Sequence, residues 1–87
     1  MKEILMFYLP TCPHCKNAFA MVEELKAENP AFAALEIKTI DESVEKELAA
    51  SYDYFFVPTY FVGGVNLHEG VPSKEEIRAV LQAALQG

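Results

Sequence analysis

The sequence predicts an α/β fold in which a four-stranded mixed sheet carries three helices, in the order β-α-β-α-β-β-α. Three patterns predict it. Residues 4–9 form an uninterrupted apolar run that leads directly into a helical pattern, as at the start of a βαβ unit. A diglycine at residues 63–64 separates two short apolar runs, which is typical of a β-hairpin. The end of the chain is amphipathic with helical spacing, so the sheet should have helices on both faces.

The first strand should occupy residues 4–9, because both alternating faces of this run are apolar, as in a central strand covered on both sides. Pro10 and Thr11 end it. A helix of about four turns should follow from Cys12 and end at Asn29-Pro30. Its apolar residues recur at helical spacing: Ala18, Met21, Val22 and Leu25.

The middle of the chain should supply a strand, a helix and the start of a further strand. Residues 35–40 mostly alternate, and the right-handed crossover rule makes this strand parallel to the first. A helix is expected near residues 43–52. Residues 55–62 are dense in aromatic and β-branched side chains, but Pro58 cannot donate to a strand ladder, so the strand should begin at Pro58 or Thr59.

The remaining elements are a hairpin and a helix. Gly63-Gly64 predicts the turn, and residues 65–69 alternate as an outer strand. Ser73 and Glu76 have the spacing of a capping box at the start of the last helix. The apolar stripe of this helix consists of Ile77, Val80, Leu81, Ala84 and Leu85.

Length and charge limit the possible functions. The chain has 87 residues, which is room for one core, so we expect a single domain over residues 1–87. Its net charge is −6, and its seven basic residues are scattered along the chain. This composition argues against binding to nucleic acid or to an anionic membrane surface.

The N-terminal segment has only a superficial likeness to a signal peptide. The apolar run at residues 4–9 is shorter than the roughly 7–15 residues of an h-region, and no small-residue cleavage site follows it. No apolar run approaches the roughly 18–20 residues of a membrane span. We therefore expect a soluble, cytoplasmic protein. We also expect it to be a monomer.

The two cysteines, Cys12 and Cys15, have CxxC spacing at the start of the first helix. In a reducing compartment this spacing favours catalysis or metal binding over a structural disulfide. Pro13 suits the first helical position, which makes Cys12 the N-cap residue. There its sulfur can accept hydrogen bonds from the N–H groups of His14 or Cys15, and the helix dipole favours the thiolate. Cys12 is therefore the predicted nucleophile, and Cys15, one turn into the helix, is the predicted resolving thiol.

His14 is predicted, together with Pro13, to tune the pKa of the Cys12 thiol. A protonated or hydrogen-bonding histidine would stabilise the thiolate and make the disulfide more oxidising. The other interpretation is a solvated histidine with little effect on the cysteines.

The order of elements, the sequence TCPHC at the first helix and VPT before the hairpin resemble the thioredoxin superfamily, and at this length its small glutaredoxin-like members. The resemblance covers nearly the whole chain. It implies a thioredoxin (glutaredoxin-like) fold and a thiol-disulfide oxidoreductase in which Cys12 attacks, a mixed disulfide forms and Cys15 resolves it. No cofactor beyond these thiols is implied. The partners would be protein disulfides or glutathione, with a reductase or glutathione as the electron donor.

The resemblance also assigns the segment before the hairpin. In the family the matching proline is cis and faces the CxxC, so Val57, Pro58 and Thr59 would form the substrate-binding edge. A cis X-Pro bond has a frequency of only about 5–6%, so this expectation rests on the resemblance. The Pro-His pair between the cysteines also occurs in strongly oxidising periplasmic members of the superfamily, which implies a raised reduction potential.

Two departures from the family patterns bear on glutathione and on proton transfer. Glutaredoxins use a Lys upstream of the CxxC and an acidic turn after the hairpin, but the loop YLPTC has no Lys and residues 68–73 have no Asp pair. Thioredoxins usually carry a buried Asp under the active site, whereas the first strand here is apolar throughout. Proton transfer from Cys15 would then need water or another group.

Metal binding is the alternative function. Structural zinc needs four ligands, and His68, the histidine outside the motif, is expected on an outer strand far from the helix start. A mononuclear zinc site is therefore not expected. The family resemblance implies a second possibility, an iron–sulfur cluster shared by two chains, with Cys12 from each chain and glutathione completing the ligands.

Four aromatic residues lie shortly before Pro58: Tyr52, Tyr54, Phe55 and Phe56. Four large rings exceed what one short connection can bury. We expect one or two of them to form an exposed apolar rim that docks a protein or peptide substrate.

Overall fold

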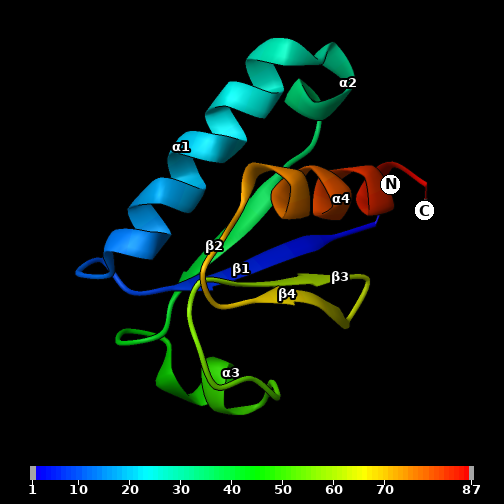
Figure 1. Cartoon of the computed structure of the whole chain (residues 1–87). Coiled ribbons are helices and arrows are strands. Elements are labelled where there is room, and N and C mark those ends of the chain that lie inside the picture. Colours follow the sequence, from blue (N-terminus) through cyan, green and yellow to red (C-terminus); the bar gives the residue numbers. More distant parts are fainter. Residues whose placement is uncertain (1, 87) are drawn as a thin grey trace.

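A computed structural model describes residues 2–86, which form four strands and four helices (Figure 1). In chain order these are β1 (Ile4–Tyr8), α1 (Pro13–Glu28), α2 (Pro30–Ala33), β2 (Ile37–Asp41), α3 (Lys46–Ala50), β3 (Thr59–Val62), β4 (Val65–Glu69) and α4 (Lys74–Leu85). The predicted four-stranded mixed sheet is confirmed. The predicted number of helices is exceeded by one, because α2 is additional. None of the helices in residues 2–86 has the length and hydropathy needed to cross a membrane.

The sheet has the strand order β2-β1-β3-β4, which makes β1 a central strand, as its apolar faces predicted. β1 runs parallel to β2 and antiparallel to β3, with Met6 opposite Tyr60. β3 and β4 form the predicted hairpin. Its turn uses Gly63 and Gly64, whose φ angles of 57° and 85° favour glycine over other residues.

The additional helix α2 begins at Asn29-Pro30, the pair from which the sequence predicted only the end of the preceding helix. The Asn29 N–H donates to the Leu25 carbonyl at 3.0 Å and ends α1. The Asn29 side chain then accepts from the Ala31 N–H at 3.0 Å and caps α2, whose first residue is Pro30. Phe32 fixes this short helix to the core, where it is buried.

Both β2 and α3 begin later than predicted. β2 begins at Ile37, because the Leu35 N–H still donates to the Phe32 carbonyl in the turn after α2. α3 starts late because the Asp41 side chain accepts from the Ser43 N–H at 2.9 Å and holds the chain in a turn.

α4 begins at the predicted capping box, where the Glu76 N–H donates to Ser73 Oγ at 3.2 Å. An ion pair joins α4 to α1, with Arg78 3.5 Å from Glu28. Exposed ion pairs of this kind add little stability. The packing of apolar side chains between the helices and the sheet therefore decides how α4 sits.

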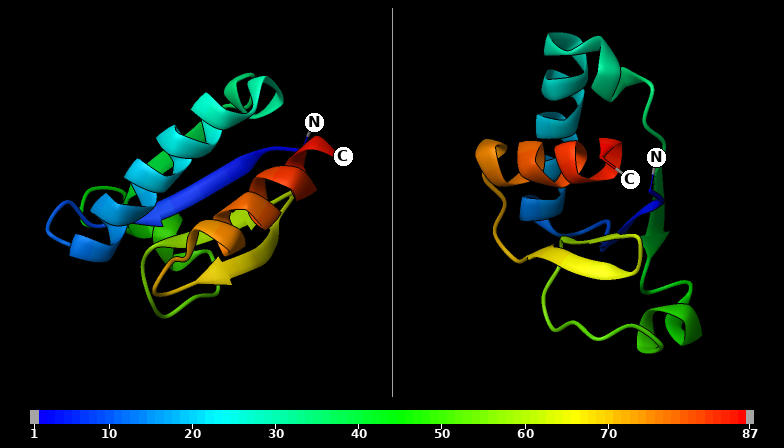
Figure 2. Two further views of the ribbon diagram at one scale, coloured as in Figure 1. Left: turned by 45° about the horizontal axis from the view of Figure 1, so that its top comes forward. Right: turned by 90° about the vertical axis from the view of Figure 1, so that its right-hand side faces the viewer.

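The sheet separates two unequal parts of the core (Figures 1 and 2). We call the side covered by α1, α2 and α4 the helical face, and the side covered by α3 and residues 51–58 the aromatic face. The helical face buries Ile4, Met6, Ala18, Val22, Leu25, Phe32, Leu35, Tyr60, Val62, Ile77, Val80, Leu81 and Ala84. The aromatic face buries Leu5, Phe7, Ile40 and Phe61, and Leu48, Ala49, Tyr52, Tyr54 and Val57 pack beside them.

Candidate active site

The CxxC motif lies at the start of α1, in the loop that follows β1 (Figure 1). Cys12 is the N-cap residue and Pro13 the first helical residue, as predicted. The Cys12 carbonyl accepts from the N–H groups of Cys15 at 3.1 Å and Lys16 at 3.2 Å. The first hydrogen bonds of the helix therefore hold the two cysteines one turn apart, and both are free thiols.

The Cys12 side chain does not cap α1 in the way the sequence predicted. In the described chain its sulfur makes no hydrogen bond to the first N–H groups of α1. The thiol instead points to the Val57 carbonyl at 3.9 Å, across a separation of 45 residues. A thiol is a weak donor, so this contact orients the sulfur more than it stabilises the fold. Cys12 is half-buried, so it is the more exposed of the two cysteines.

Cys15 occupies a different environment. It is 1% exposed on the buried side of α1, in agreement with its predicted enclosure. Burial is the main cause that raises the pKa of the Cys15 thiol to about 12, although a hydrogen bond from the Leu9 backbone opposes the shift. The Cys12 sulfur and the Glu42 carboxylate raise it further. Cys15 is therefore a protonated, inaccessible thiol at neutral pH.

The segment before β3 faces Cys12, as the family resemblance implied. The Val57–Pro58 peptide bond is cis, which confirms that expectation. Val57 is half-buried, whereas Pro58 and Thr59 are buried. The Thr59 hydroxyl donates to the Phe56 carbonyl and is thereby occupied. Of the three residues assigned to substrate binding, Val57 is the accessible one, and the side chains of the other two shape the loop.

Glu69 holds this loop from β4, a role that the sequence analysis missed. Its Oε2 accepts from the N–H groups of Phe55 at 2.8 Å and Phe56 at 3.1 Å. The neighbouring Gly70 N–H donates to the Pro58 carbonyl at 2.9 Å. The bond from the Phe55 backbone is the main cause that lowers the pKa of the Glu69 carboxyl below its usual value. A single acid at the end of an outer strand is too common a pattern to have predicted this contact.

His14 is exposed at the start of α1. In residues 2–86 its side chain takes part in no hydrogen bond or ion pair, with Cys12 or otherwise. Its influence on the active site, together with that of Pro13, stays a prediction.

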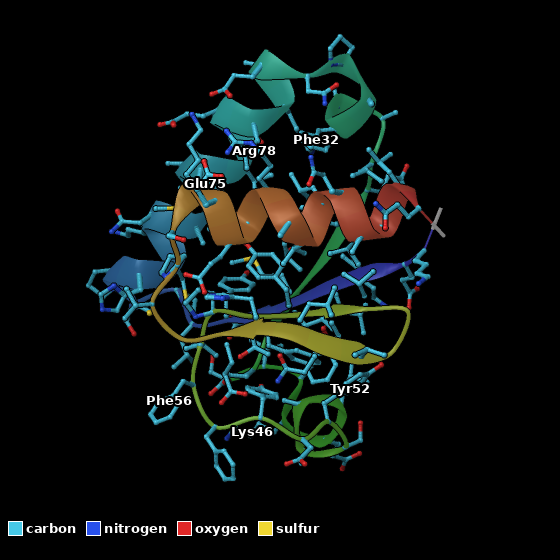
Figure 3. All side chains as sticks on the ribbon, turned by 45° about the vertical axis from the view of Figure 1, so that its right-hand side comes forward. Phe32, Lys46, Tyr52, Phe56, Glu75 and Arg78 are labelled. Carbon is cyan, nitrogen blue, oxygen red and sulfur yellow. The ribbon has the colours of Figure 1, made fainter. Side chains whose placement is uncertain are left out.

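The aromatic group divides as expected. Tyr52 and Tyr54 pack on Phe7, with ring centroids 4.9 and 4.8 Å apart, and belong to the aromatic face. Phe55 and Phe56 are 85% and 67% exposed. Figure 3 shows Phe56 projecting from the loop, away from the sheet. Two exposed rings therefore lie directly before Val57, whose carbonyl faces the Cys12 thiol.

Tyr60, on β3, is a further polar residue in the core beside the site. The sequence predicted only that it belongs to a strand. It is 0% exposed, and its hydroxyl has no hydrogen-bond partner in the described residues. Burial, and after it the charge of a Cys15 thiolate, raises the pKa of Tyr60. Tyr60 lies opposite Met6 on the helical face, and Cys15 lies on the buried side of α1, which packs on that face. A tyrosine after Val-Pro-Thr gave no signal for this, because tyrosine is common in strands.

Metal-binding residues do not gather in the described part of the chain, where no group of three or more His, Cys, Asp or Glu side chains could hold an ion. His68 lies on the edge strand β4, with Nδ1 3.2 Å from Glu76 and Nε2 3.2 Å from the Gly70 carbonyl. Its ring is thus engaged with α4 and the end of β4.

Comparison with known proteins gives one consistent family. Residues 2–82 match the family model described as thioredoxin domain. The chain is 36% identical over 75 residues to a probable thioredoxin of Methanothermobacter thermautotrophicus, which covers 86% of each chain. It is 32% identical over 83 residues to a thioredoxin of Methanocaldococcus jannaschii, which covers 95% of each. Its fold is similar to that of a mutant thioredoxin from Halobacterium salinarum, with a TM-score of 0.69 and 22% identity, covering 95% of this chain and 74% of the other.

These similarities agree with the resemblance carried by TCPHC and VPT. They support thiol-disulfide oxidoreductase chemistry in general, and they do not single out glutathione. The chain belongs to the thioredoxin domain family.

Proposed function

We propose that the protein reduces or exchanges protein disulfides, with Cys12 as the nucleophile and Cys15 as the resolving thiol. The observation that carries the proposal is the difference between the two sulfurs. Cys12 is half-buried at the N-cap of α1, whereas Cys15 is buried and its pKa is raised to about 12. A substrate disulfide can reach the first sulfur, and the second reacts only within the protein.

The reaction has two exchange steps. The Cys12 thiolate attacks one substrate sulfur, the substrate S–S bond breaks, and the other substrate sulfur leaves as a thiolate that takes up a proton. The Cys15 thiol then gives up its proton and attacks Cys12 Sγ in the mixed disulfide, which releases the remaining substrate sulfur as a thiol. The substrate gains two electrons and two protons, and Cys12 and Cys15 become a disulfide. A reductase or glutathione returns two electrons to the pair.

Protein and peptide disulfides are the proposed substrates. The backbone at Val57 lies beside Cys12, so an extended substrate segment can pair with it while its sulfur meets Cys12. The exposed rings of Phe55 and Phe56 offer apolar contact to such a segment. The missing Lys in YLPTC makes glutathione the weaker candidate. The reducing cytoplasm is the proposed compartment, since it keeps the dithiol reduced.

Two cysteine variants test the mechanism. Cys12→Ser should lose all reduction of insulin disulfides by dithiothreitol. Cys15→Ser should lose turnover, but its Cys12 should still attack the substrate and form a stable mixed disulfide, visible by mass spectrometry of the intact protein. Activity in Cys12→Ser, or no trapped adduct in Cys15→Ser, would show that the roles are misassigned.

Substrate class is tested separately on the unmodified protein. Glutathione-dependent reduction of a small mixed disulfide should be slower than reduction of insulin. Faster reaction with glutathione would assign the protein to glutaredoxin chemistry instead.

The proposed effect of His14 is a reduction potential above the roughly −270 mV of thioredoxin. His14→Ala should lower the potential by about 20–30 mV, measured by equilibration with a dithiol buffer. Lys16→Ala, which removes an exposed cation from the same helical turn, should change it less. An unchanged potential in His14→Ala means that the histidine is simply solvated.

A further inference from the structure

Resolution by Cys15 meets an electrostatic obstacle in this protein. The thiol is 1% exposed and its pKa is raised to about 12, so little of it is thiolate at neutral pH. The strand beneath it, β1, has the sequence ILMFY and carries no charged side chain. A low-dielectric site of this kind makes a newly formed thiolate costly unless a dipole is aimed at it.

The groups around Cys15 make the obstacle larger. The Glu42 carboxylate is negative and raises the pKa of Cys15. Glu42 is also occupied, because it accepts a hydrogen bond from the Tyr54 hydroxyl at 2.8 Å. The Cys12 sulfur raises the pKa of Cys15 in the dithiol and is uncharged once it is bonded in the mixed disulfide. Neither group can therefore stabilise a negative charge on Cys15.

Tyr60 places a hydroxyl in the same buried layer. Because Tyr60 lies opposite Met6 in the sheet, its side chain is on the helical face, the face toward which the buried side of α1 turns Cys15. The hydroxyl is buried and has no partner within residues 2–86. An unpaired buried hydroxyl destabilises a fold, so its presence calls for an explanation.

We propose that the Tyr60 hydroxyl is the hydrogen-bond donor that stabilises the Cys15 thiolate while it attacks the mixed disulfide. The inference rests on the proposed function, in which Cys15 is the resolving thiol. Sulfur accepts strongly only once it is negatively charged, so the donor is unpaired in the dithiol and becomes engaged in the resolving step. The Cys15 proton passes to the substrate sulfur that leaves Cys12, and Tyr60 keeps its own proton. In the reverse reaction the same donor stabilises Cys15 as the leaving thiolate.

Two observations indicate that Tyr60 acts as a hydrogen-bond donor, and that neither Tyr60 nor its neighbour His68 acts as a base toward Cys15. Burial and the charge of Cys15 raise the pKa of Tyr60, so the hydroxyl stays protonated throughout. His68, the residue opposite Tyr60 on β4, is the nearest titratable neighbour in the register. Its ring nitrogens already contact Glu76 and the Gly70 carbonyl, each at 3.2 Å, so it does not compete for Cys15.

The reaction with Ellman's reagent separates the two thiols. With the reagent in excess in a stopped-flow instrument, Cys12 releases the first thionitrobenzoate and Cys15 then releases the second from the mixed disulfide. Tyr60→Phe should leave the first release unchanged. It should slow the second roughly 10- to 100-fold, the effect of losing a hydrogen bond to a charged group. The pH profile of the second release should also move to higher pH, which a purely structural role would not cause.

Tyr52→Phe is the matched control, because it removes a hydroxyl from the aromatic face. Both releases should keep their wild-type rates in this variant. A second release in Tyr60→Phe that matches the wild type at every pH overturns the inference, while a normal first release shows that the proposed function stands. Absence of the first release in the wild-type protein would overturn both.

The wild-type protein provides a test that does not depend on the folding of a variant. In the dithiol protein, the carbon that bears the Tyr60 hydroxyl should change its ¹³C chemical shift as rising pH ionises Cys15, because the hydroxyl then donates to the thiolate. In the disulfide protein, where Cys15 cannot ionise, the same carbon should not change over that pH range, and the corresponding carbon of Tyr52 should respond alike in the two redox states. A Tyr60 carbon with the same pH dependence in the dithiol and the disulfide overturns the inference.

Discussion

The two faces of the sheet are built from the same strands but by different means. The helical face is covered by α1 and α4, each of which buries four residues, whereas α3 on the aromatic face buries none. The aromatic face depends instead on packed rings, with the Phe7 centroid 4.8 Å from that of Tyr54 and 5.7 Å from that of Phe61. The active site joins the two, since Cys15 is fixed by the helical face and Val57 packs on the aromatic one. Cys15 is therefore anchored on the helical face, where the helices bury more residues. The proposed substrate loop is anchored on the aromatic face, where the helix buries none.

The largest expected effect comes from removing the central ring of the aromatic face. Phe7→Ala should lower the free energy of unfolding by about 3–5 kcal/mol, because Phe7 is 0% exposed and contacts three rings. Urea denaturation measures the change, and Leu81→Ala provides the matching loss on the helical face, about 2–5 kcal/mol. A loss under about 1 kcal/mol for Phe7→Ala would mean that the packing of the aromatic face contributes little to stability.

Stability should fall in alkali, with contributions from both faces. The pKa values of Tyr54 and Tyr60 are raised above the usual 10.0, mainly by burial. Above that pH the unfolded chain loses protons that the folded chain keeps, so the contribution of each tyrosine to stability is full below pH 10 and declines as pH rises, by at most about 1.4 kcal/mol per pH unit. Cys15 acts in the same direction from its ordinary value of 9.0. Urea titrations between neutral pH and alkaline pH measure the slope, and Tyr60→Phe should flatten it more than Tyr54→Phe, because Tyr60 is the more deeply buried.

Replacing the same two tyrosines by Phe should affect stability differently at neutral pH. Tyr54→Phe removes the bond to Glu42 and should lower the free energy of unfolding by about 1 kcal/mol. Tyr60→Phe removes a hydroxyl without a partner in residues 2–86 and should leave stability unchanged or raise it. Thermal and urea unfolding of both variants make the comparison. A clear loss of stability in Tyr60→Phe would mean that its hydroxyl is bonded in the dithiol protein.

The smallest effect on stability is expected at the exposed rim. Phe56→Ser should change the free energy of unfolding by less than about 0.5 kcal/mol, since the ring is 67% exposed. It should nevertheless raise the KM for a protein disulfide and leave the reaction with Ellman's reagent unchanged. If both substrates are affected equally, the ring supports the loop and does not dock the substrate.

Local signals were enough to predict most of the architecture. The apolar run at residues 4–9 predicted a central strand, and Ser73 with Glu76 predicted the start of α4, because each pattern has its cause within a few residues. Asn29-Pro30 was read correctly as an end of α1. That the same pair also starts α2 depends on a side-chain bond to Ala31, which the sequence allowed but did not require.

The site was predictable in its residues and less so in its contacts. The CxxC pattern indicated both cysteines, but Cys12 turns its sulfur toward a carbonyl 45 residues away instead of capping its own helix. The contact of Glu69 with the loop and the burial of Tyr60 on the face where α1 packs likewise depend on elements that the fold brings together. Contacts over such separations have no local pattern, so they become visible only in the folded chain.

The hydrogen bond from the Lys2 N–H to the Ala84 carbonyl, at 2.9 Å, places the two ends of the described chain side by side. They meet at the end of β1 opposite to the one that leads into Cys12 (Figure 1). A tether attached to either end, whether to a bead, an electrode or a fused reporter, would therefore hold the molecule at the end of β1 that lies away from Cys12. Every tethered copy would present its thiols outward, so immobilisation should not reduce access to large disulfide substrates.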